Sequence, residues 1–344
     1  MSPESVNQKP ASAGGFPRPV LFISRCLGFD SCRYNGETIR DPFVEKLKPF
    51  VETGTLCPEV EAGLGVPRAP VRIVLHGDRP ILYQPATGKD ITPDMLAVTE
   101  AFRNETQAGE FDGFILKSRS PSCGFKDVKV YKSDGKDPRN ISGSGSRGTG
   151  FFGGAIAETF MEKFGLPVED EGRLLNFTIR EHFLLRIFTL ARFRMVKESN
   201  TIQALIDFHT DNKLLFLGMN EGGMRELGRI TAAYNKKNLA DTLDSYEKEL
   251  KKTLVKPPSY KAMINSLQHA FGHVSRDLLP KERGFFLNLL EEYRDERIPL
   301  SVPVKLIASY AVRFDNGYLL RQNLLSPYPP GITDITDSGK GRDY

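Results

Sequence analysis

The sequence of 344 residues has few cysteines and no CxxC pair: its four cysteines are Cys26, Cys32, Cys57 and Cys123. Structural zinc sites take their ligands from short knuckles of closely spaced cysteines. Such knuckles are missing, which argues against a structural zinc. An HExxH motif is missing too. The pair His269 and His273 has helical spacing but no carboxylate where a metalloprotease helix would need one, so we expect a core or surface role for it.

Long hydrophobic runs are also absent. No apolar stretch approaches the roughly 18 residues that a membrane-spanning helix needs, so we expect a soluble protein without a membrane partner. Residues 1–16 lack a positive segment followed by an apolar one, which predicts a disordered leader and not a signal peptide. The expected compartment is the cytoplasm, where cysteines stay reduced and serve catalysis or metal binding more often than disulfides.

A large net charge is a third absence. Lysine and arginine outnumber aspartate and glutamate by 47 to 43, and a net charge of +4 neither requires nor excludes a nucleic-acid partner. The candidate basic clusters are Lys236 with Lys237, the group Lys248, Lys251, Lys252 and Lys256, and the arginines at 173, 180, 186, 192 and 194. Acidic residues alternate with the first two groups at helical spacing, so a solvated helix face is the alternative interpretation.

The pattern of apolar residues divides the chain into two parts. In the first half strand and helix signals alternate, as in a Rossmann-like parallel sheet of an α/β domain. The expected strands are 20–24, the run ending at 57, 71–76, 81–84, 111–117 and 127–132, with helices at 43–50, 92–109 and about 151–164. From about residue 174 apolar residues recur three and four apart, which predicts an all-α region. We expect an α/β domain over 17–197, a helical domain over 198–330 and a polar tail over 331–344.

What the sequence does contain is a cysteine after each of three strand-like runs. The runs are VLFISRC, VETGTLC and FDGFILKSRSPSC, which end at Cys26, Cys57 and Cys123. In an open α/β sheet ligands gather outside the carboxyl ends of the strands, so these three thiols can converge on one point. Widely spaced soft thiolates suit an iron–sulfur cluster better than a zinc ion. The alternative for any one of them is a small buried hydrophobe.

A glycine-rich stretch, GSGSRGTGFFGG, opens the helix expected at about 151–164. Its backbone N–H groups and Arg147 are candidates for holding a phosphate of a substrate. The stretch matches neither a GxGxxG turn after a strand nor a Walker loop. A plain mobile loop is therefore the alternative.

Two sets of motifs carry a resemblance. SRCLG with RYNG, CPEVEAGLGVPR and KSRSPSCG lie within 18–194, and in these motifs the chain resembles the thiouracil desulfidase family. LIDFHTDNKLL, LGRI, HAFGH and YLLRQNLLSPYP lie within 198–330, which resembles the YbgA-like helical domain. Together the two parts are similar to the bacterial tRNA 4-thiouridine desulfidases.

The resemblance implies a [4Fe-4S] cluster held by three cysteines, with one iron left without a protein ligand. Cys26, Cys57 and Cys123 match the positions of those ligands. Glu59 and Ser120 match the family's catalytic carboxylate and serine.

Two further residues leave alternatives open. Cys32 follows closely after Cys26 and is a candidate fourth ligand, although a fully ligated cluster would have no open iron. Glu61 lies just after Cys57, as Glu59 does, and only the resemblance favours Glu59.

The activity that the resemblance implies is removal of sulfur from 4-thiouridine in tRNA, giving uridine and hydrogen sulfide without electron transfer. An open iron acts as a Lewis acid on the C=S bond, a water deprotonated by Glu59 attacks C4, and Ser120 donates a hydrogen bond or relays a proton. The helical domain is expected to hold the tRNA through shape and phosphate contacts. The stacked base must be at least partly extruded from the RNA.

Three alternatives to this activity stay open. The same chemistry on free 2-thiouracil or 4-thiouracil would need no helical domain. A non-enzymatic iron–sulfur protein that binds RNA or acts as a sensor would need a fully ligated cluster, which Cys32 could complete. A zinc-dependent hydrolase fits least, because three thiolates without a nearby histidine differ from the usual catalytic zinc sites.

Overall fold

The structure is a computed structural model of the chain. It describes residues 15–337 except 108, 134–136, 140–144 and 236–237. Most of the leader expected at 1–16, part of the tail expected at 331–344, and the pair Lys236 and Lys237 therefore lie outside the described residues. Within the described part, no helix has both the length and the apolar character needed to cross a membrane.

The first sheet is parallel and contains the strands that precede the cysteines. Its strands stand in the order β2, β1, β6, β9. They are β1 (Val20–Ser24), β2 (Glu52–Leu56), β6 (Gly113–Leu116) and β9 (Val168–Asp170). The register pairs Ser24 with Leu56, so β1 and β2 end side by side. This confirms the predicted α/β fold class with a parallel sheet.

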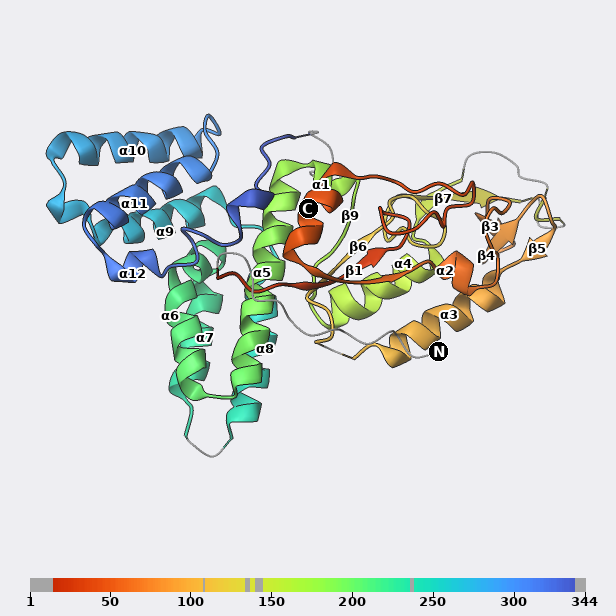
Figure 1. The fold of residues 1–344 in the computed structure, drawn as a ribbon, viewed down its shortest axis with the longest axis horizontal. Helices are drawn as coiled ribbons and strands as arrows, with labels where there is room; N and C mark the ends of the chain where they lie inside the picture. Colours follow the sequence, from red (N-terminus) through yellow and green to blue (C-terminus); the bar gives the residue numbers. More distant parts are fainter. Residues whose placement is uncertain (1–14, 108, 134–136, 140–144, 236–237, 338–344) are drawn as a thin grey trace.

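Helices pack on both faces of this sheet because successive side chains of a strand point to opposite faces. Phe22 and Phe114 pack on one face against α3 (Thr92–Glu105), α4 (Phe151–Ile156) and the π-helical turn Ala157–Lys163. Leu21 and Ile23 pack on the other face against α1 (Pro42–Leu47) and α5 (Phe177–Ser199). Figure 1 shows α3 and α4 running beside β1 and β6. The result is a three-layer α/β/α core.

A second sheet, of mixed direction, extends this part of the chain. Its strands stand in the order β5, β4, β3, β7, β8. They are β3 (Arg72–His76), β4 (Arg79–Gln84), β5 (Lys89–Asp90), β7 (Val128–Lys132) and β8 (Arg147–Gly148). β3 and β4 form an antiparallel hairpin at Gly77, whose φ of 63° suits glycine. The strands predicted at 71–76, 81–84 and 127–132 therefore form, but in a sheet separate from that of β1.

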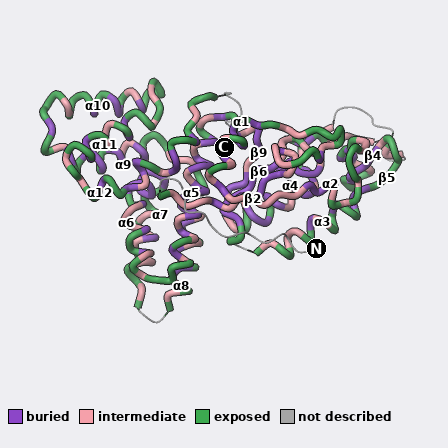
Figure 2. The backbone as a smooth tube through the Cα atoms, viewed as in Figure 1, coloured by how far each residue is buried: buried purple, intermediate pink, exposed green. Residues whose placement is uncertain are grey.

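From α5 onward the chain is helical, as predicted. The helices after α5 are α6 (Ile202–Met219), α7 (Glu221–Ala232), α8 (Leu239–Leu254), α9 (Tyr260–Gly272), α10 (Pro280–Arg294), α11 (Ser301–Arg313) and α12 (Gly317–Leu320). Short 3₁₀ turns lie at Lys48–Phe50, Arg173–Leu175, Ser275–Asp277 and Pro330–Ile332. Buried residues run along the inner sides of α6 and α8 (Figure 2).

Helix α5 joins the two halves. Its Phe183 and Phe188 belong to the core on the sheet. Further along the same helix, the ring of Phe193 stacks on Tyr246 of α8 with the centroids 5.3 Å apart. The division expected near residue 197 thus falls in the last turn of a helix that both halves share.

Candidate active site

The carboxyl ends of three parallel strands bring the candidate cysteines together. Cys26 follows β1, Cys57 follows β2 as the N-cap of α2 (Pro58–Glu61), and Cys123 lies on the loop after β6. The charge of Cys57 acts on Cys26, and the charges of both act on Cys123. The three thiols are therefore close enough for the charge on one to change the pKa of another.

The surroundings of Cys26 and Cys123 disfavour their thiolates. Burial, together with the charge of Cys57, raises the pKa of Cys26 to about 12. Burial and the charges of Cys26 and Cys57 raise the pKa of Cys123, and a hydrogen bond with Ser24 opposes this only in part. A cation bound among the sulfurs would reverse the effect, because a coordinated thiol gives up its proton.

The fourth cysteine also belongs to this site. Cys32 lies in the loop after β1 and is 2% exposed. A hydrogen bond between the thiols of Cys32 and Cys57 lowers the pKa of Cys57 and raises the pKa of Cys32. The sulfur of Cys57 also lies 3.8 Å from the carbonyl oxygen of Cys32. The sequence made Cys32 a candidate fourth ligand but could not reveal its contact with Cys57, because the loop that carries Cys32 is irregular.

Glu59, the candidate catalytic carboxylate, lies beside the thiols in the first turn of α2. Its Oε2 accepts a hydrogen bond from Nε of Arg68 at 2.7 Å, and its Oε1 accepts one from the hydroxyl of Ser122 at 2.8 Å. The charge of Glu59 adds to the effect of burial in raising the pKa of Cys123. The carboxylate is thus fixed at both oxygens and lies within electrostatic reach of the sulfurs.

Arg68 connects this carboxylate to two of the cysteines. Its Nη2 donates to the carbonyl oxygen of Cys32 at 3.0 Å and lies 3.9 Å from the sulfur of Cys57. Its Nη1 donates to the carbonyl oxygen of Gly65 at 2.8 Å. Sequence reasoning gave Arg68 no role. The signal was its place at the end of the motif CPEVEAGLGVPR, which begins with the cysteine and the glutamate that it contacts.

Glu61, the alternative carboxylate, has a different environment. It forms an ion pair with Arg25 at 3.2 Å, and the two side chains are 41% and 27% exposed. Residues two apart in a helix do not face the same direction. The structure therefore separates an exposed Glu61 from a mostly buried Glu59 that contacts the site.

Ser120 and Ser122 take different positions in the loop that carries Cys123. The hydroxyl oxygen of Ser120 accepts hydrogen bonds from the backbone N–H groups of Ser122 at 3.2 Å and Cys123 at 3.1 Å. Its own proton remains to be donated. Ser122, which the sequence did not single out, is the serine that donates to Glu59. Ser120 thus contacts the backbone of Cys123 directly, whereas Ser122 contacts the carboxylate of Glu59.

The beginning of this loop is anchored by Glu171, just after β9. The backbone N–H and the hydroxyl of Ser118 donate to the two oxygens of Glu171 at 2.8 and 2.7 Å. Lys117 pairs with the same carboxylate. The backbone N–H of Lys117 also donates to the hydroxyl of Ser24 at 3.0 Å, which ties the loop to the end of β1.

The described part of the glycine-rich stretch donates backbone hydrogen bonds to the loop that carries Cys123. The N–H of Gly150 donates to the carbonyl oxygen of Gly124 at 2.6 Å, and the N–H of Gly153 donates to that of Ser122 at 2.9 Å. A Cβ on Gly153 would lie 2.1 Å from the carbonyl oxygen of Cys123, so only glycine fits this approach. The N–H groups of Gly150 and Gly153 are therefore used within the protein, which corrects the interpretation of these two as phosphate donors. Residues 143 and 144 of the stretch lie outside the described residues.

In the described part of the chain, no three histidine, cysteine, aspartate or glutamate side chains meet at the position of a single metal ion. The donors at the strand ends are thiols. In an iron–sulfur cluster each thiolate binds a different iron, so the ligands surround the cluster and do not meet at one ion.

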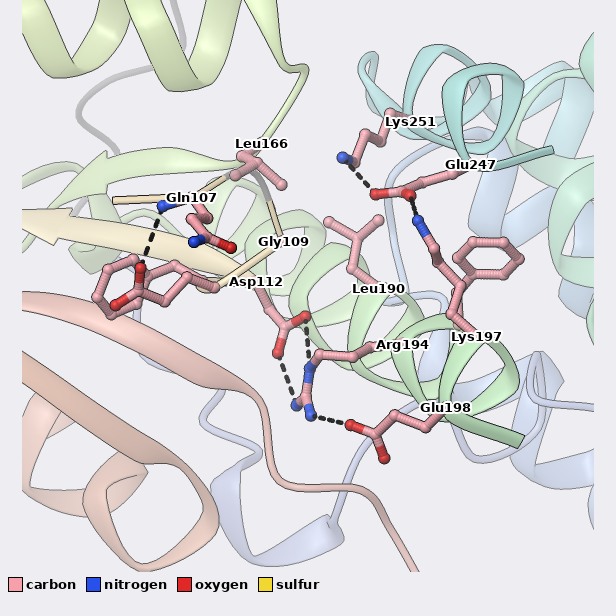
Figure 3. A pocket seen from close by; sticks show the side chains of 13 residues that line it. Gln107, Gly109, Asp112, Leu166, Leu190, Arg194, Lys197, Glu198, Glu247 and Lys251 are labelled. Atoms are coloured by element: carbon pink, nitrogen blue, oxygen red, sulfur yellow. Dashed lines mark hydrogen bonds and ion pairs between the residues drawn. The ribbon is translucent and has the colours of Figure 1, made fainter. Parts of the chain in front are cut away.

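A cavity of about 510 Å³ lies at the other end of the first sheet (Figure 3). Asp112, which precedes β6, pairs there with Arg194 of α5 at 3.1 Å. Lys197 of α5 pairs with Glu247 of α8 at 2.6 Å. These four charged groups thus pair with one another across the junction of the two halves. None of the candidate site residues lines it.

The site lies within a segment that has known relatives. Residues 21–171 match the family described as 2-thiouracil desulfurase. The uncharacterized protein YbbK of Bacillus subtilis (strain 168) is 34% identical over 136 residues, which are 37% of this chain and 85% of that protein. The chain belongs to the 2-thiouracil desulfurase family. All four cysteines, both candidate carboxylates and Arg68 lie inside the desulfurase segment.

The helical part has a match of its own. Residues 213–329, after the desulfurase segment, match DUF1722, a family of proteins of unknown function. The uncharacterized protein YbgA of Escherichia coli (strain K12) is 29% identical over 158 residues, 45% of this chain and 93% of that protein. A solved structure of a [4Fe-4S]-dependent thiouracil desulfidase is 25% identical with a TM-score of 0.35, over 46% of this chain and 93% of that one.

Proposed function

We propose that the protein is a [4Fe-4S]-dependent desulfidase that hydrolyses the C4=S group of 4-thiouridine in tRNA. The reaction takes up one water and gives uridine and hydrogen sulfide, with no net electron transfer. The observation that carries the proposal is the gathering of three strand-terminal thiols next to the mostly buried carboxylate of Glu59 in a segment of the desulfurase family.

We assign the cluster to Cys26, Cys57 and Cys123. The donor set fits, because the three thiols are mostly buried and the charged forms of Cys26 and Cys123 are disfavoured until a cation is present, while Cys57 already ionises more readily than a free thiol. An all-thiol set is typical of iron–sulfur ligation. When bound, the cluster would supply an iron without a protein ligand that accepts the thiocarbonyl sulfur and polarises the C=S bond.

Glu59 is the proposed general base. It takes a proton from the water that attacks C4, and the hydrogen bonds from Arg68 and Ser122 hold its oxygens in place for this step. Ser120 is proposed to donate its remaining proton to the substrate or to relay a proton to the departing sulfur. Its oxygen is held by two backbone N–H groups, which orients that proton.

The tRNA is proposed to contact the helical domain, over 198–330, while the α/β domain over 17–197 performs the chemistry. Helices rich in arginine and lysine suit recognition of folded RNA by shape and phosphate. Extrusion of the base is needed to bring its sulfur to the strand ends. We place the enzyme in the cytoplasm, where tRNA and reduced cysteines are both found.

Two observations favour other candidates. The description of the matched family names 2-thiouracil, which favours free 2-thiouracil or 4-thiouracil as the substrate. The contact of Cys32 with Cys57 favours a fully ligated cluster in an RNA-binding or sensor protein. Both are separable from the main proposal by experiment.

The test uses the full chain, reconstituted anaerobically. Iron and acid-labile sulfide are counted, and tRNA containing 4-thiouridine is then followed by loss of its near-ultraviolet absorbance and by release of sulfide. Roughly four irons with multiple turnovers on tRNA support the proposal. Turnover on free thiobases alone selects the second candidate, and a protein that binds no iron overturns the mechanism.

Serine variants of single cysteines assign the ligands. Cys26→Ser, Cys57→Ser and Cys123→Ser are each expected to lose most of the iron. Cys32→Ser is the matched control, since it keeps the other three thiols, and it is expected to retain the cluster and turnover. Loss of the cluster in Cys32→Ser would favour the fully ligated alternative.

A further inference from the structure

A basic groove of about 420 Å³ lies on the second sheet, beside the loop of the candidate site. In the described part of the chain its lining includes four cations and no carboxylate. The cations are Arg72, Arg119, Lys129 and Arg147, with Pro121 and Tyr131 among the other lining residues. The chemistry proposed for Glu59 and the cysteines does not use this groove.

Three of these cations form a row across neighbouring strands. β7 pairs Lys129 with Arg147 of β8, and the pairing of Ile73 with Val130 sets Arg72 of β3 beside Lys129. Residues in register point to the same face of a sheet, on strands about 4.8 Å apart. All three side chains are exposed. Like charges at such positions destabilise a sheet, so the row costs free energy unless an anion binds it.

The row lies on the face of the second sheet that points away from the main core. Ile73 and Val128 belong to the main core, whereas Tyr131 packs with a small separate cluster on the opposite face. The guanidinium of Arg72 lies 5.3 Å from the centre of the Tyr131 ring, and Arg147 donates to the carbonyl oxygen of Asp127 at 3.0 Å. Among the described residues, no carboxylate pairs with any of the four cations. Arg72 and Arg147 are thus held by contacts that leave their charge unneutralised.

Arg119 joins the groove to the candidate active site. It has a φ of 56°, a left-handed conformation that costs a residue with a side chain about 1 kcal/mol or more. The conformation persists because Glu171 holds Ser118 on one side and the turn at Ser120 fixes the other. Ser120 and Cys123 thus belong to the same loop that presents Arg119 to the groove.

We propose that the groove binds the phosphate group next to the thiolated pyrimidine. This deepens the proposed function and rests on it. The planar guanidinium groups of Arg72 and Arg147 suit bidentate contacts to phosphate oxygens. A row of cations that leads to the catalytic loop suits successive phosphates of an RNA chain, and Tyr131 with Arg72 offers a flat surface for a neighbouring base. The same chemistry would accept the phosphate of a free thiolated nucleotide.

The test compares three substrates that differ in phosphate: free 4-thiouracil, 4-thiouridine 5′-monophosphate, and tRNA containing 4-thiouridine. The variants are Arg72→Ala, Lys129→Ala and Arg147→Ala, singly and together, in the reconstituted full chain. Lys89→Ala is the matched control, because Lys89 is an exposed cation of the same sheet outside the groove. Arg72→Lys keeps the positive charge but loses the planar guanidinium that can make bidentate contacts to a phosphate. Binding of a fluorescent unmodified tRNA transcript is measured as a function of salt.

If RNA supplies the phosphate, each single variant raises the Kd for the transcript roughly threefold to tenfold. The slope of log Kd against log salt then falls by about 0.7 to 0.9 per lost contact. If the free nucleotide supplies it, the KM for 4-thiouridine 5′-monophosphate rises while transcript binding is unchanged. Turnover of free 4-thiouracil, which has no phosphate, stays at the wild-type value in either case.

Unchanged transcript binding together with an unchanged KM for the monophosphate would overturn the groove proposal. That result is distinct from failure of the proposed function, in which the wild-type protein consumes none of the three substrates. Binding of the unmodified tRNA transcript then still tests the groove, because the binding measurement needs no turnover.

Discussion

Arg68 and Glu59 form an ion pair of 2.7 Å in which the side chains are only 4% and 13% exposed. The same guanidinium contacts the carbonyl oxygen of Cys32 and the sulfur of Cys57. One arginine therefore fixes the proposed base relative to two of the four cysteines. A buried pair of this kind is costly to break, because the remaining charge stays buried without a partner.

Arg68→Ala is accordingly expected to lower the free energy of unfolding by about 3 to 5 kcal/mol. Turnover is expected to fall as well, since the carboxylate loses its orientation. Arg25→Ala is the matched control, because the half-exposed pair of Arg25 with Glu61 should contribute about 1 kcal/mol or less. Urea unfolding and steady-state turnover measure the two effects. Equal losses in the two variants would contradict the role given to Arg68.

Replacement of the two candidate carboxylates tests which one acts as the base. Glu59→Gln keeps the shape of the side chain and is expected to lower kcat by about a factor of 10² to 10⁴, the usual contribution of a general base. Glu61→Gln, on the exposed side of α2, is expected to retain most of the activity. Iron content is measured in both, so that loss of the cluster is not mistaken for loss of the base. A larger effect in Glu61→Gln would reverse the assignment.

Serine replacements separate proton donation from positioning. Ser120→Ala removes the acceptor of two backbone N–H groups and the proposed donor, so kcat should fall by about a hundredfold or more. Ser122→Ala removes one hydrogen bond to Glu59 and should cost roughly a factor of ten. Ser120→Thr retains a hydroxyl and is expected to recover part of the activity. If Ser120→Thr were no better than Ser120→Ala while both kept their iron, the hydroxyl would have no chemical role.

The buried side chain of His182 is expected to make the stability of the protein depend on pH. It is buried in α5 with Nε2 2.9 Å from the carbonyl oxygen of Leu254, and burial, aided by the charge of Arg186, lowers its pKa to about 4. The unfolded chain, with a pKa near 6.5, takes up the proton first as the pH falls. The stability that His182 contributes is thus complete above pH 6.5 and is lost between pH 6.5 and pH 4.

His182→Asn, which can still donate to Leu254, is expected to reduce this slope by up to about 1.4 kcal/mol per pH unit. Burial raises the pKa of Asp170 to about 6, which acts in the opposite direction, so the informative quantity is the difference between variant and wild type. His269→Asn, at an exposed position, is the matched substitution. Chemical unfolding at several pH values measures the slopes. Identical slopes in His182→Asn and wild type would refute the prediction.

The sequence predicted those parts of the site that follow from strand direction. Cys26 and Cys57 end neighbouring parallel strands, and the direction of such strands decides which ends meet. Arg68 and Ser122 were not predicted, because they reach Glu59 from loops whose paths no periodicity encodes. The contact of Cys32 was missed for the same reason.

The second sheet illustrates another limit of sequence reasoning. Alternation of apolar residues identified the strands at 71–76, 81–84 and 127–132, but it does not say which strands pair. The row formed by Arg72, Lys129 and Arg147 depends on that pairing and could not be read from the sequence. Likewise, Gly153 is explained by its close approach to the backbone of Cys123, a reason that only the packing reveals.

Helix α5 has a consequence for how the two halves respond to ligands. Leu190 and Phe193 on α5 pack in the same hydrophobic core as Tyr246 on α8, while Phe183 on the same helix packs on the parallel sheet. Unfolding of either half would expose apolar surface of the other, so the stabilities of the two halves are coupled. A molecule that binds only the helices is therefore expected to raise the melting temperature of the cysteine-bearing half as well.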